Sequence, residues 1–159
     1  MSAPATSADP LALEQQVCFA LAVTNRAVLA VYRPLLEPLG LTHPQYLVML
    51  ALWDHRKSSA APLTVKKIAT TLQLDSATLS PMLKRLEALG LITRTRSAAD
   101  ERSTDVELTA AGSALRTRAE SIPSAVVDRL GVSMSEIEQL HRVLTRVNTA
   151  ALAAGALDS

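Results

Sequence analysis

The stretch that decides the fold lies at residues 63–107 and reads LTVKKIATTLQLDSATLSPMLKRLEALGLITRTRSAADERSTDVE. Thr64 can cap a short helix over 65–72, in which apolar residues recur on one face. After a turn at 73–74, Asp75 or Ser76 can cap a second helix. The apolar residues of this second helix repeat at spacings of three and four, as a single buried face requires, at Leu79, Met82, Leu83, Leu86 and Leu89. The stretch therefore predicts two helices joined by a short turn.

A hairpin is expected to follow the second helix. Gly90 can end that helix, and two β-prone runs, 91–96 and 104–108, are joined by the seven residues 97–103. Helix, turn, helix and hairpin in this order form a winged helix-turn-helix, which is a DNA-reading unit. Pro81 would lie inside the second helix, so that helix either begins near Ser80 or has distorted first turns. We expect the DNA-binding unit to span residues 63–108.

Positive charge is concentrated in the same segment. The whole chain has 16 Lys and Arg against 15 Asp and Glu, a net charge of +1. Between residues 66 and 102, seven basic residues oppose four acidic ones. An excess of this size is by itself typical of a solvated protein surface. Combined with the helix-turn-helix and the hairpin, it favours binding to the phosphates of DNA.

Composition excludes several other classes. The 159 residues are 48% hydrophobic, which predicts one core and a single domain. No eighteen consecutive residues are all apolar, and the N-terminus lacks a signal pattern, so we expect a cytoplasmic protein without a membrane span. Cys18 is the one cysteine and the three histidines lack ligand spacing, so neither an intrachain disulfide nor a metal site is expected. We also expect no cofactor. No nucleophile–base spacing or glycine-rich phosphate loop points to an enzyme.

The segments on either side of the DNA-binding unit are expected to be helical. Residues 1–10 have the composition of a disordered tail, and 11–33 form a long helix with only three charged residues, ended by Pro34, Pro38 and Gly40. Thr42 and Gln45 form a capping box for a helix to about residue 55, which a linker over 56–62 joins to the DNA-binding unit.

Two further helices are expected at the C-terminal end. The first runs over 110–130 with a kink or break at Pro123, and the second begins at the capping box Ser133–Glu136. Apolar helices at both ends of a small domain favour packing against a second subunit. We therefore expect a mostly α protein with a small β-hairpin, in which N-terminal helices (11–62) and C-terminal helices (109–159) form a dimerisation domain. Such a homodimer would hold two reading units about 34–36 Å apart on a pseudo-palindromic double-stranded DNA operator.

Several runs, at these spacings, resemble the MarR family of transcriptional regulators from about Leu13 to the C-terminus. They are YRPLL at 32–36, THPQY at 42–46, LDSATLSP at 74–81 and DER at 100–102. The run QVCFAL at 16–21 makes the chain most similar to the organic-hydroperoxide-sensing, OhrR-like branch. The resemblance implies a homodimeric repressor that leaves its operator when organic hydroperoxide oxidises Cys18.

The resemblance also implies where DNA is contacted. The helix after Asp75 would lie in the major groove, and the wing would send Arg102 into the minor groove, where a narrow groove concentrates negative potential. Short side chains on the helix let the backbone approach the bases, while basic residues reach phosphates. The expected contacts are Lys66, Ser76, Ala77, Thr78, Ser80, Lys84, Arg85, Arg94, Arg96, Asp100 and Arg102. Asp100 beside Arg102 is, in isolation, typical of an exposed ion pair.

The resemblance assigns Cys18 to the redox-sensing cysteine, and Tyr32 and His43 to the sensor pocket. Free cysteines are most often small buried hydrophobes, and we expect Cys18 inside its helix, away from the N-terminal end. Fourteen residues of helix rise about 21 Å, so Cys18 and Tyr32 can meet only across an antiparallel dimer interface, as the resemblance implies.

Two tyrosines of the family's sensor pocket are replaced here by Ala22 and His43. A protonated His43 would still favour the thiolate of Cys18, but a role as a first-turn helix residue is equally open. A second hypothesis therefore remains open, in which the repressor responds to a non-covalent phenolic or lipophilic ligand. This ligand would be held between the outer helices (within 11–62 and 109–159) and the DNA-binding unit (63–108).

Overall fold

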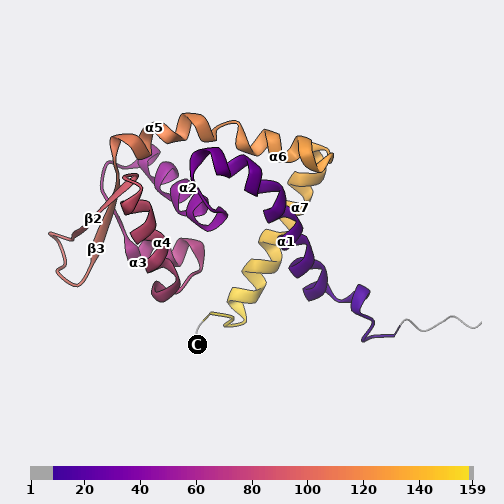
Figure 1. Cartoon of the computed structure of the whole chain (residues 1–159). Helices are drawn as coiled ribbons and strands as arrows, with labels where there is room; N and C mark the ends of the chain where they lie inside the picture. Colours follow the sequence, from indigo (N-terminus) through magenta and orange to yellow (C-terminus); the bar gives the residue numbers. More distant parts are fainter. Residues whose placement is uncertain (1–8, 158–159) are drawn as a thin grey trace, which may run out of the picture.

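The computed structural model describes residues 9–157, so most of the expected tail at 1–10 lies outside the described residues. Seven α-helices, three strands and two short 3-10 helices follow one another in this part of the chain. In order, the elements are η1 (Leu13–Gln15), α1 (Val17–Leu36), η2 (Glu37–Leu39), α2 (His43–Ser58), β1 (Leu63–Thr64), α3 (Val65–Leu72), α4 (Ser76–Ala88), β2 (Ile92–Arg96), β3 (Thr104–Leu108), α5 (Ala110–Ala119), α6 (Ile122–Leu130) and α7 (Met134–Ala153). Figure 1 shows the winged unit (63–108) at one end, the outer helices α1 and α7 at the other, and α5 and α6 running between them.

The winged helix-turn-helix expected from 63–108 is confirmed. The Thr64 side chain accepts a hydrogen bond of 3.1 Å from the Lys67 N–H and so begins α3. Strands β2 and β3 pair antiparallel, with Ile92 opposite Leu108 and Arg96 opposite Thr104. The sequence did not reveal β1, which pairs with the other edge of β3 and gives the order β1-β3-β2. A two-residue strand is too short to show an alternating pattern.

The hydrophobic core lies where α2, α3 and α4 pack together and against the small sheet. Recognition helix α4 contributes Leu79, Leu83 and Leu86, each at most 1% exposed. These side chains form one cluster with buried residues of α2, of β2 and of the helices α5 and α6. The periodicity of α4 was therefore interpreted correctly, except that its last leucine, Leu89, is 51% exposed.

Several predicted boundaries were wrong. Helix α1 begins at Val17, after the 3-10 turn η1, instead of at residue 11. It also continues through Pro34 to Leu36, although the proline has no N–H to donate within the helix. The chain turns at Gly40, which has a φ of 70°. Helix α2 extends to Ser58, so the expected linker is shorter than 56–62.

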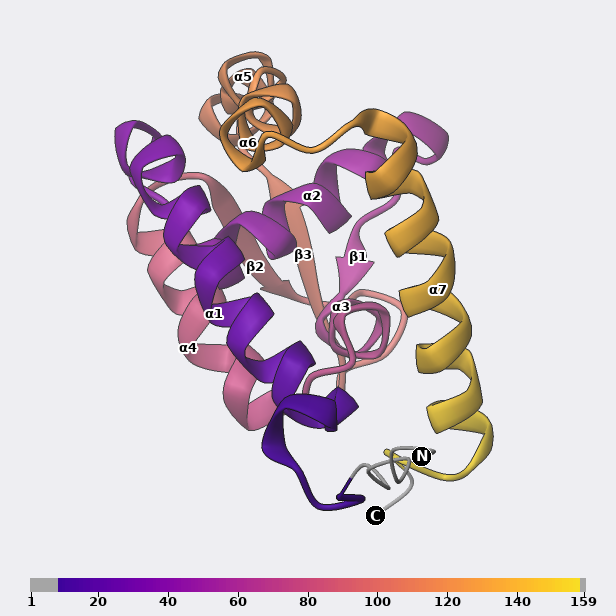
Figure 2. The ribbon, with the colours of Figure 1, turned by 90° about the vertical axis from the view of Figure 1, so that its right-hand side faces the viewer.

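The C-terminal half follows the prediction closely. The expected long helix is split into α5 and α6, with Pro123 in the first turn of α6, where its missing N–H is tolerated. The capping box at Ser133 and Glu136 begins α7, with the Glu136 N–H donating to the Ser133 hydroxyl. Helix α7 stands apart from α1, as Figure 2 shows, and none of its residues is buried.

The helix at the N-terminal end is apolar and exposed along most of its length. Within Val17–Leu39, a window of 18 residues has a mean hydropathy of 1.2, and 6% of that window is buried. By length and composition alone this stretch is able to cross a membrane, which the search for uninterrupted apolar runs did not reveal. An unpartnered dimerisation helix has the same composition.

Candidate nucleic-acid interface and sensor pocket

Helix α4 presents its polar face outward because its apolar face is buried. The Asp75 carboxylate accepts a hydrogen bond of 2.6 Å from the Thr78 N–H and begins the helix, so the helix starts at Ser76 and not near Ser80. This bond keeps the pKa of Asp75 below its ordinary value. Pro81 lies inside a helix that continues across it. All six predicted reading residues of this helix are exposed, namely Ser76, Ala77, Thr78, Ser80, Lys84 and Arg85.

The wing is joined to the recognition helix by an ion pair. The guanidinium of Arg94 on β2 donates from Nη2 to Glu87 Oε2 at 2.7 Å and from Nε to the same oxygen at 3.1 Å. The Arg94 N–H donates to the other oxygen of Glu87 at 3.2 Å. These hydrogen bonds lower the pKa of Glu87, which keeps the carboxylate charged. Arg94, expected to contact DNA, therefore acts first on the orientation of the wing relative to α4.

At the tip of the wing, the Asp100 side chain shapes the turn that presents Arg102. Asp100 Oδ1 accepts a hydrogen bond of 3.0 Å from the Arg102 N–H, and the Asp100 carbonyl accepts from the Ser103 N–H at 2.9 Å. Asp100 thus binds the backbone of Arg102 and not its guanidinium. Within residues 9–157, the ion pairs do not include the Arg102 side chain, which is exposed.

In residues 66–102, most acidic side chains accept hydrogen bonds within the chain, whereas most basic side chains form no ion pair among the described residues. Three of the four acidic side chains bond within the chain, at Asp75, Glu87 and Asp100. Of the seven basic side chains, only Arg94 forms an ion pair among the described residues. Lys66, Lys84, Arg85, Arg96 and Arg102 are all exposed. The surface of α3, α4 and the wing is therefore suited to a polyanion.

The structure places Cys18 differently from the expectation. Because α1 begins at Val17, Cys18 is the second residue of the helix and not an interior one. It is exposed in the single chain. The first turn of a helix has unpaired N–H groups and the positive end of the helix dipole, which favour an anionic group.

The predicted pocket residues Tyr32 and His43 lie together, and Tyr46 joins them. The ring of Tyr32 meets that of His43 edge-on, with centroids 4.9 Å apart. The Tyr46 centroid lies 6.1 Å from that of Tyr32 and 6.3 Å from that of His43. Tyr46 was not among the residues expected in the pocket; its place three residues after His43 on one helix face was the available signal.

Burial changes the titration of this aromatic cluster, which we define as Tyr32, His43 and Tyr46. Burial lowers the pKa of His43, so the imidazole is neutral at pH 7. Burial also raises the pKa of Tyr32, and the pKa of Tyr46 is raised by burial and by the neighbouring Tyr32. Burial therefore disfavours a positively charged His43 in the single chain and favours the protonated form of both tyrosine hydroxyls.

An open pocket of about 570 Å³ lies between α2, α3, α5 and α6, and Tyr46 of the aromatic cluster forms part of its wall. Its apolar wall includes Leu47, Leu50 and Leu72, and its charged groups include Lys57 and Arg116. Among residues 9–157, no three His, Cys, Asp or Glu side chains gather as a metal site would require. The arrangement is suited to a small amphipathic molecule.

The comparisons with known proteins identify the class. Residues 30–118 match the family model of the transcriptional regulators SarA/Rot. The organic hydroperoxide resistance transcriptional regulator of Bacillus subtilis (strain 168) is 45% identical over 136 residues, which cover 86% of this chain and 89% of that protein. The chain therefore belongs to the MarR family of winged-helix DNA-binding transcriptional regulators. Its relatives are regulators and not enzymes, as the sequence predicted.

Other relatives are similar over most of the chain. The HTH-type transcriptional regulator TtmR of Methylorubrum extorquens (strain PA1) is 41% identical over 80% of this chain, which spans 63% of that protein. Among solved structures, reduced AbfR bound to DNA has a TM-score of 0.74 and 31% identity, covering 89% of this chain and 94% of that one. AbfR comes from Staphylococcus epidermidis. Overoxidised AbfR bound to DNA and disulfide-formed AbfR have TM-scores of 0.63 and 0.58.

Proposed function

We propose that this chain is a homodimeric MarR-type repressor that binds a pseudo-palindromic operator and is released when Cys18 is oxidised by an organic hydroperoxide. The observation that carries the DNA-binding part is the outward face of α4, whose short side chains are flanked by exposed cations while the nearby acids are bonded within the chain. Relatives that are DNA-binding regulators support it. As a DNA-binding regulator, the protein would act in the cytoplasm.

The second copy of the chain is proposed to cover the outer helices. Apolar side chains on α1 and α7 are exposed in the single chain, among them Val17, Leu140, Val143, Leu144 and Val147. Their burial against a second copy would stabilise a dimer by about 25 cal/mol for each Å² removed from water. Residues 11–62 and 109–159 would then supply the dimerisation helices, and 63–108 the DNA-binding unit. An apolar α1 in such an interface needs no membrane.

Each half of the dimer would place α4 in the major groove and the wing in the adjacent minor groove. Ser76, Ala77, Thr78 and Ser80 would approach the bases, and Arg102 would enter the minor groove. The other cations would contact phosphates, namely Lys66, Lys84, Arg85 and Arg96, while Arg94 and Asp100 would hold the wing in position.

The DNA-binding part is tested by titrating a fluorescent palindromic duplex at several salt concentrations. Affinity should fall steeply with salt, because several phosphates are neutralised in each half. Arg102→Ala should weaken binding by about tenfold or more and lower the salt slope by about 1. Arg129→Ala removes an exposed arginine of α6 and is the matched control. A flat salt response would contradict DNA binding, and equal effects of the two variants would remove the wing from it.

The proposed chemistry takes place at the Cys18 sulfur. The thiolate attacks the terminal oxygen of the hydroperoxide; an S–O bond forms and the O–O bond breaks. The sulfur is oxidised by two electrons to a sulfenic acid, and the peroxide is reduced to an alkoxide that takes a proton from water to give the alcohol. Because Cys18 is the one cysteine in the sequence, recovery would need an external thiol.

Three features support Cys18 as the sensor. It lies in the first turn of α1, at the positive end of the helix dipole, the single chain exposes it, and its relative in Bacillus subtilis is a regulator of organic hydroperoxide resistance. The aromatic cluster would meet Cys18 of the partner across an antiparallel interface, where Tyr32, which is only partly buried in the single chain, would donate its hydroxyl to the sulfur. An oxidised sulfur there would displace the outer helices and change the separation of the two reading units.

The redox part is tested by brief exposure to cumene hydroperoxide, followed by mass spectrometry and an operator-release assay. The wild type should gain one oxygen atom on Cys18 and lose operator affinity together. Cys18→Ser should bind the operator normally and ignore the peroxide. Release of the Cys18→Ser variant by peroxide, or a wild type that never responds, would contradict the redox proposal and leave DNA binding unaffected.

The 570 Å³ pocket between α2, α3, α5 and α6 favours a second candidate, a non-covalent phenolic or lipophilic effector. Leu50→Trp would fill part of this pocket. If a phenolic acid releases the wild type from DNA but not Leu50→Trp, while both respond equally to peroxide, the pocket is the effector site. Identical responses of the two proteins to the phenolic acid would exclude it.

A further inference from the structure

Helix α5 connects the winged unit to the outer helices, and its first end is held firmly. Thr109 donates from its N–H to the Leu91 carbonyl at 3.0 Å and from its hydroxyl to the Gly90 carbonyl at 2.6 Å. The buried indole of Trp53 donates to the Gly112 carbonyl at 2.9 Å. These bonds join the start of α5 to α2 and to the base of the wing.

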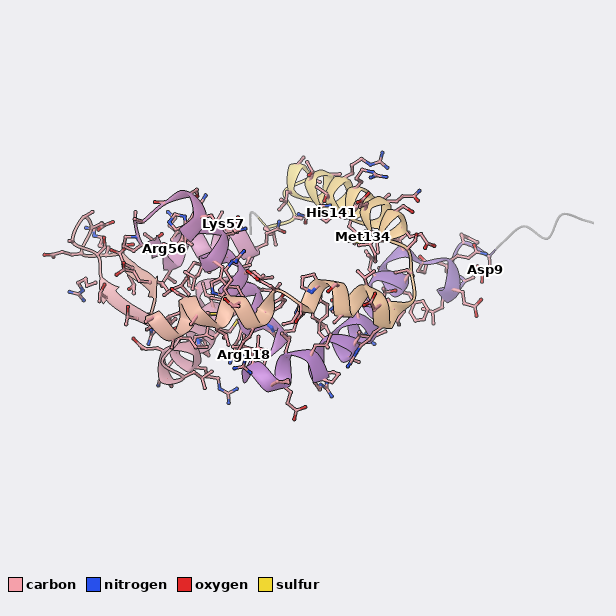
Figure 3. All side chains as sticks on the ribbon, turned by 90° about the horizontal axis from the view of Figure 1, so that it is seen from above. Asp9, Arg56, Lys57, Arg118, Met134 and His141 are labelled. Atoms are coloured by element: carbon pink, nitrogen blue, oxygen red, sulfur yellow. The ribbon has the colours of Figure 1, made fainter. Side chains whose placement is uncertain are left out.

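The last turn of α5 is held by a different kind of contact. Arg118 Nη2 donates a hydrogen bond of 2.7 Å to the carbonyl of Pro38, 80 residues earlier in the chain. Pro38 lies in η2, the 3-10 turn between α1 and α2. Figure 3 shows Arg118 on the other side of α5 from Arg56 and Lys57. This bond joins α5 to the end of α1.

Arg118 also completes the C-terminal cap of the α1–η2 segment. The carbonyls of Leu36 and Glu37 accept hydrogen bonds from the Leu41 and Gly40 N–H groups, at 3.3 and 2.9 Å. The Pro38 carbonyl accepts instead from the guanidinium of Arg118. A cation at this position is also favoured by the negative end of the helix dipole.

The other contacts of α5 constrain its direction less than the hydrogen bond from Arg118 to Pro38 does. Its buried apolar residues Leu115 and Ala119 stabilise packing, but apolar contacts are not directional and permit small rotations. The neighbouring Arg116 forms an ion pair with Glu120 of the same turn, which cannot orient α5 relative to another element. Just beyond, α5 ends at Ala119 and the chain enters α6, which packs along α1.

We infer that Arg118 is a positioning residue: its bond to Pro38 sets the angle between the winged unit and α1, and so the separation of the two reading units in the dimer. The inference rests on the proposed function, because α1 sets that separation only if it lies in the dimer interface. Without the bond, α5 remains attached to the winged unit at Thr109 and Trp53, but its last turn is no longer hydrogen-bonded to η2 at the end of α1.

The test measures affinity for duplexes whose half-sites are spaced at the optimum or one base pair closer or further apart. The wild type should bind the two altered duplexes distinctly more weakly, because rigid reading units fit one spacing. In Arg118→Ala this penalty should fall by about threefold, with a smaller loss at the optimal spacing. Arg118→Lys, which can still donate to the Pro38 carbonyl, should keep the wild-type profile. Arg116→Ala is the matched control on the same helix and should also keep it.

Each of the following outcomes would contradict the inference about Arg118. If Arg118→Ala shows the wild-type ratio of affinities, the inference is wrong while the proposed function stands. If that variant is unfolded by circular dichroism, or weakens every duplex by the same factor, Arg118 only stabilises the fold and the inference is also wrong. A wild type that binds all spacings equally, or none, would overturn the proposed dimeric clamp and the inference with it.

Discussion

Gly112→Ala should destabilise the protein, although a glycine-to-alanine change inside a helix normally stabilises it. In an unconstrained helix the gain is about 1 kcal/mol. Here a Cβ on residue 112 would overlap the carbonyl oxygen of Leu91, and would lie 3.0 Å from the carbonyl carbon of Leu91 and 3.3 Å from Leu108 Cδ2. Because the first two of these are backbone atoms, α5 itself must move away from the base of the wing.

Two costs oppose the gain. Overpacking against a backbone costs about 1–3 kcal/mol. A shift of α5 also breaks the 2.9 Å bond from Trp53 Nε1 to the Gly112 carbonyl, and an unsatisfied buried donor costs about 1–3 kcal/mol. The net expectation is a loss of about 3 kcal/mol, which corresponds to a fall in Tm of about 6–12 °C for a domain of this size.

The assay is thermal unfolding followed by circular dichroism, with Ser113→Ala as the control on the exposed side of the same helix. Ser113→Ala should be neutral or slightly stabilising. Operator affinity of Gly112→Ala should fall as well, because α5 carries the winged unit. A Gly112→Ala protein that melts at or above the wild-type temperature would refute the close approach of α5 to Leu91.

Three further expectations follow from single positions. Gln73→Gly should raise the free energy of unfolding by about 0.5–1 kcal/mol in urea titrations, because Gln73 has a φ of 53° and glycine relieves that strain; a destabilised variant would contradict it. Because burial lowers the pKa of His43, neutral His43 contributes its full stability above the pKa of the unfolded chain, and this contribution is lost as the pH falls below that pKa. The fall in Tm between pH 7.5 and 5.5 should therefore be smaller in His43→Phe than in the wild type. An unchanged fall in Tm would mean that another group causes the pH response. Glu87→Gln, Arg94→Gln and the double variant should weaken operator binding to the same degree by fluorescence anisotropy, since the two side chains act as a pair; additive losses would mean that Arg94 contacts DNA independently.

The elements with strong local signals were predictable. Thr64, Asp75 and Ser133 are capping residues whose side chains need only the next turn of backbone, and each begins a helix as expected. Gly90 and the two runs after it gave the wing, because strand alternation and turn residues act over a few residues. The start of α1 was missed, since the Gln16 that precedes it forms no side-chain cap that a sequence would show.

The candidate site was also only partly predictable from the sequence. The periodicity of α4 determined which of its residues face outward, so the exposure of Ser76, Ala77, Thr78 and Ser80 followed from the sequence. The contacts of Arg94 did not follow from the sequence, because its partner Glu87 lies on another element and competes with any DNA phosphate for the guanidinium. The position of Cys18 in the first turn of α1 and the neutral state of His43 depended likewise on a helix boundary and on burial.

The amino-acid sequence by itself determined the order of the helices, the turn and the wing, because caps, glycines and apolar spacing act within one or two turns of chain. Only the tertiary structure decided which charged side chains are free to meet DNA, how Tyr46 joins Tyr32 and His43, and that Arg118 reaches Pro38. These contacts join residues on different elements, and the energy of such a contact depends on a geometry that no local pattern encodes.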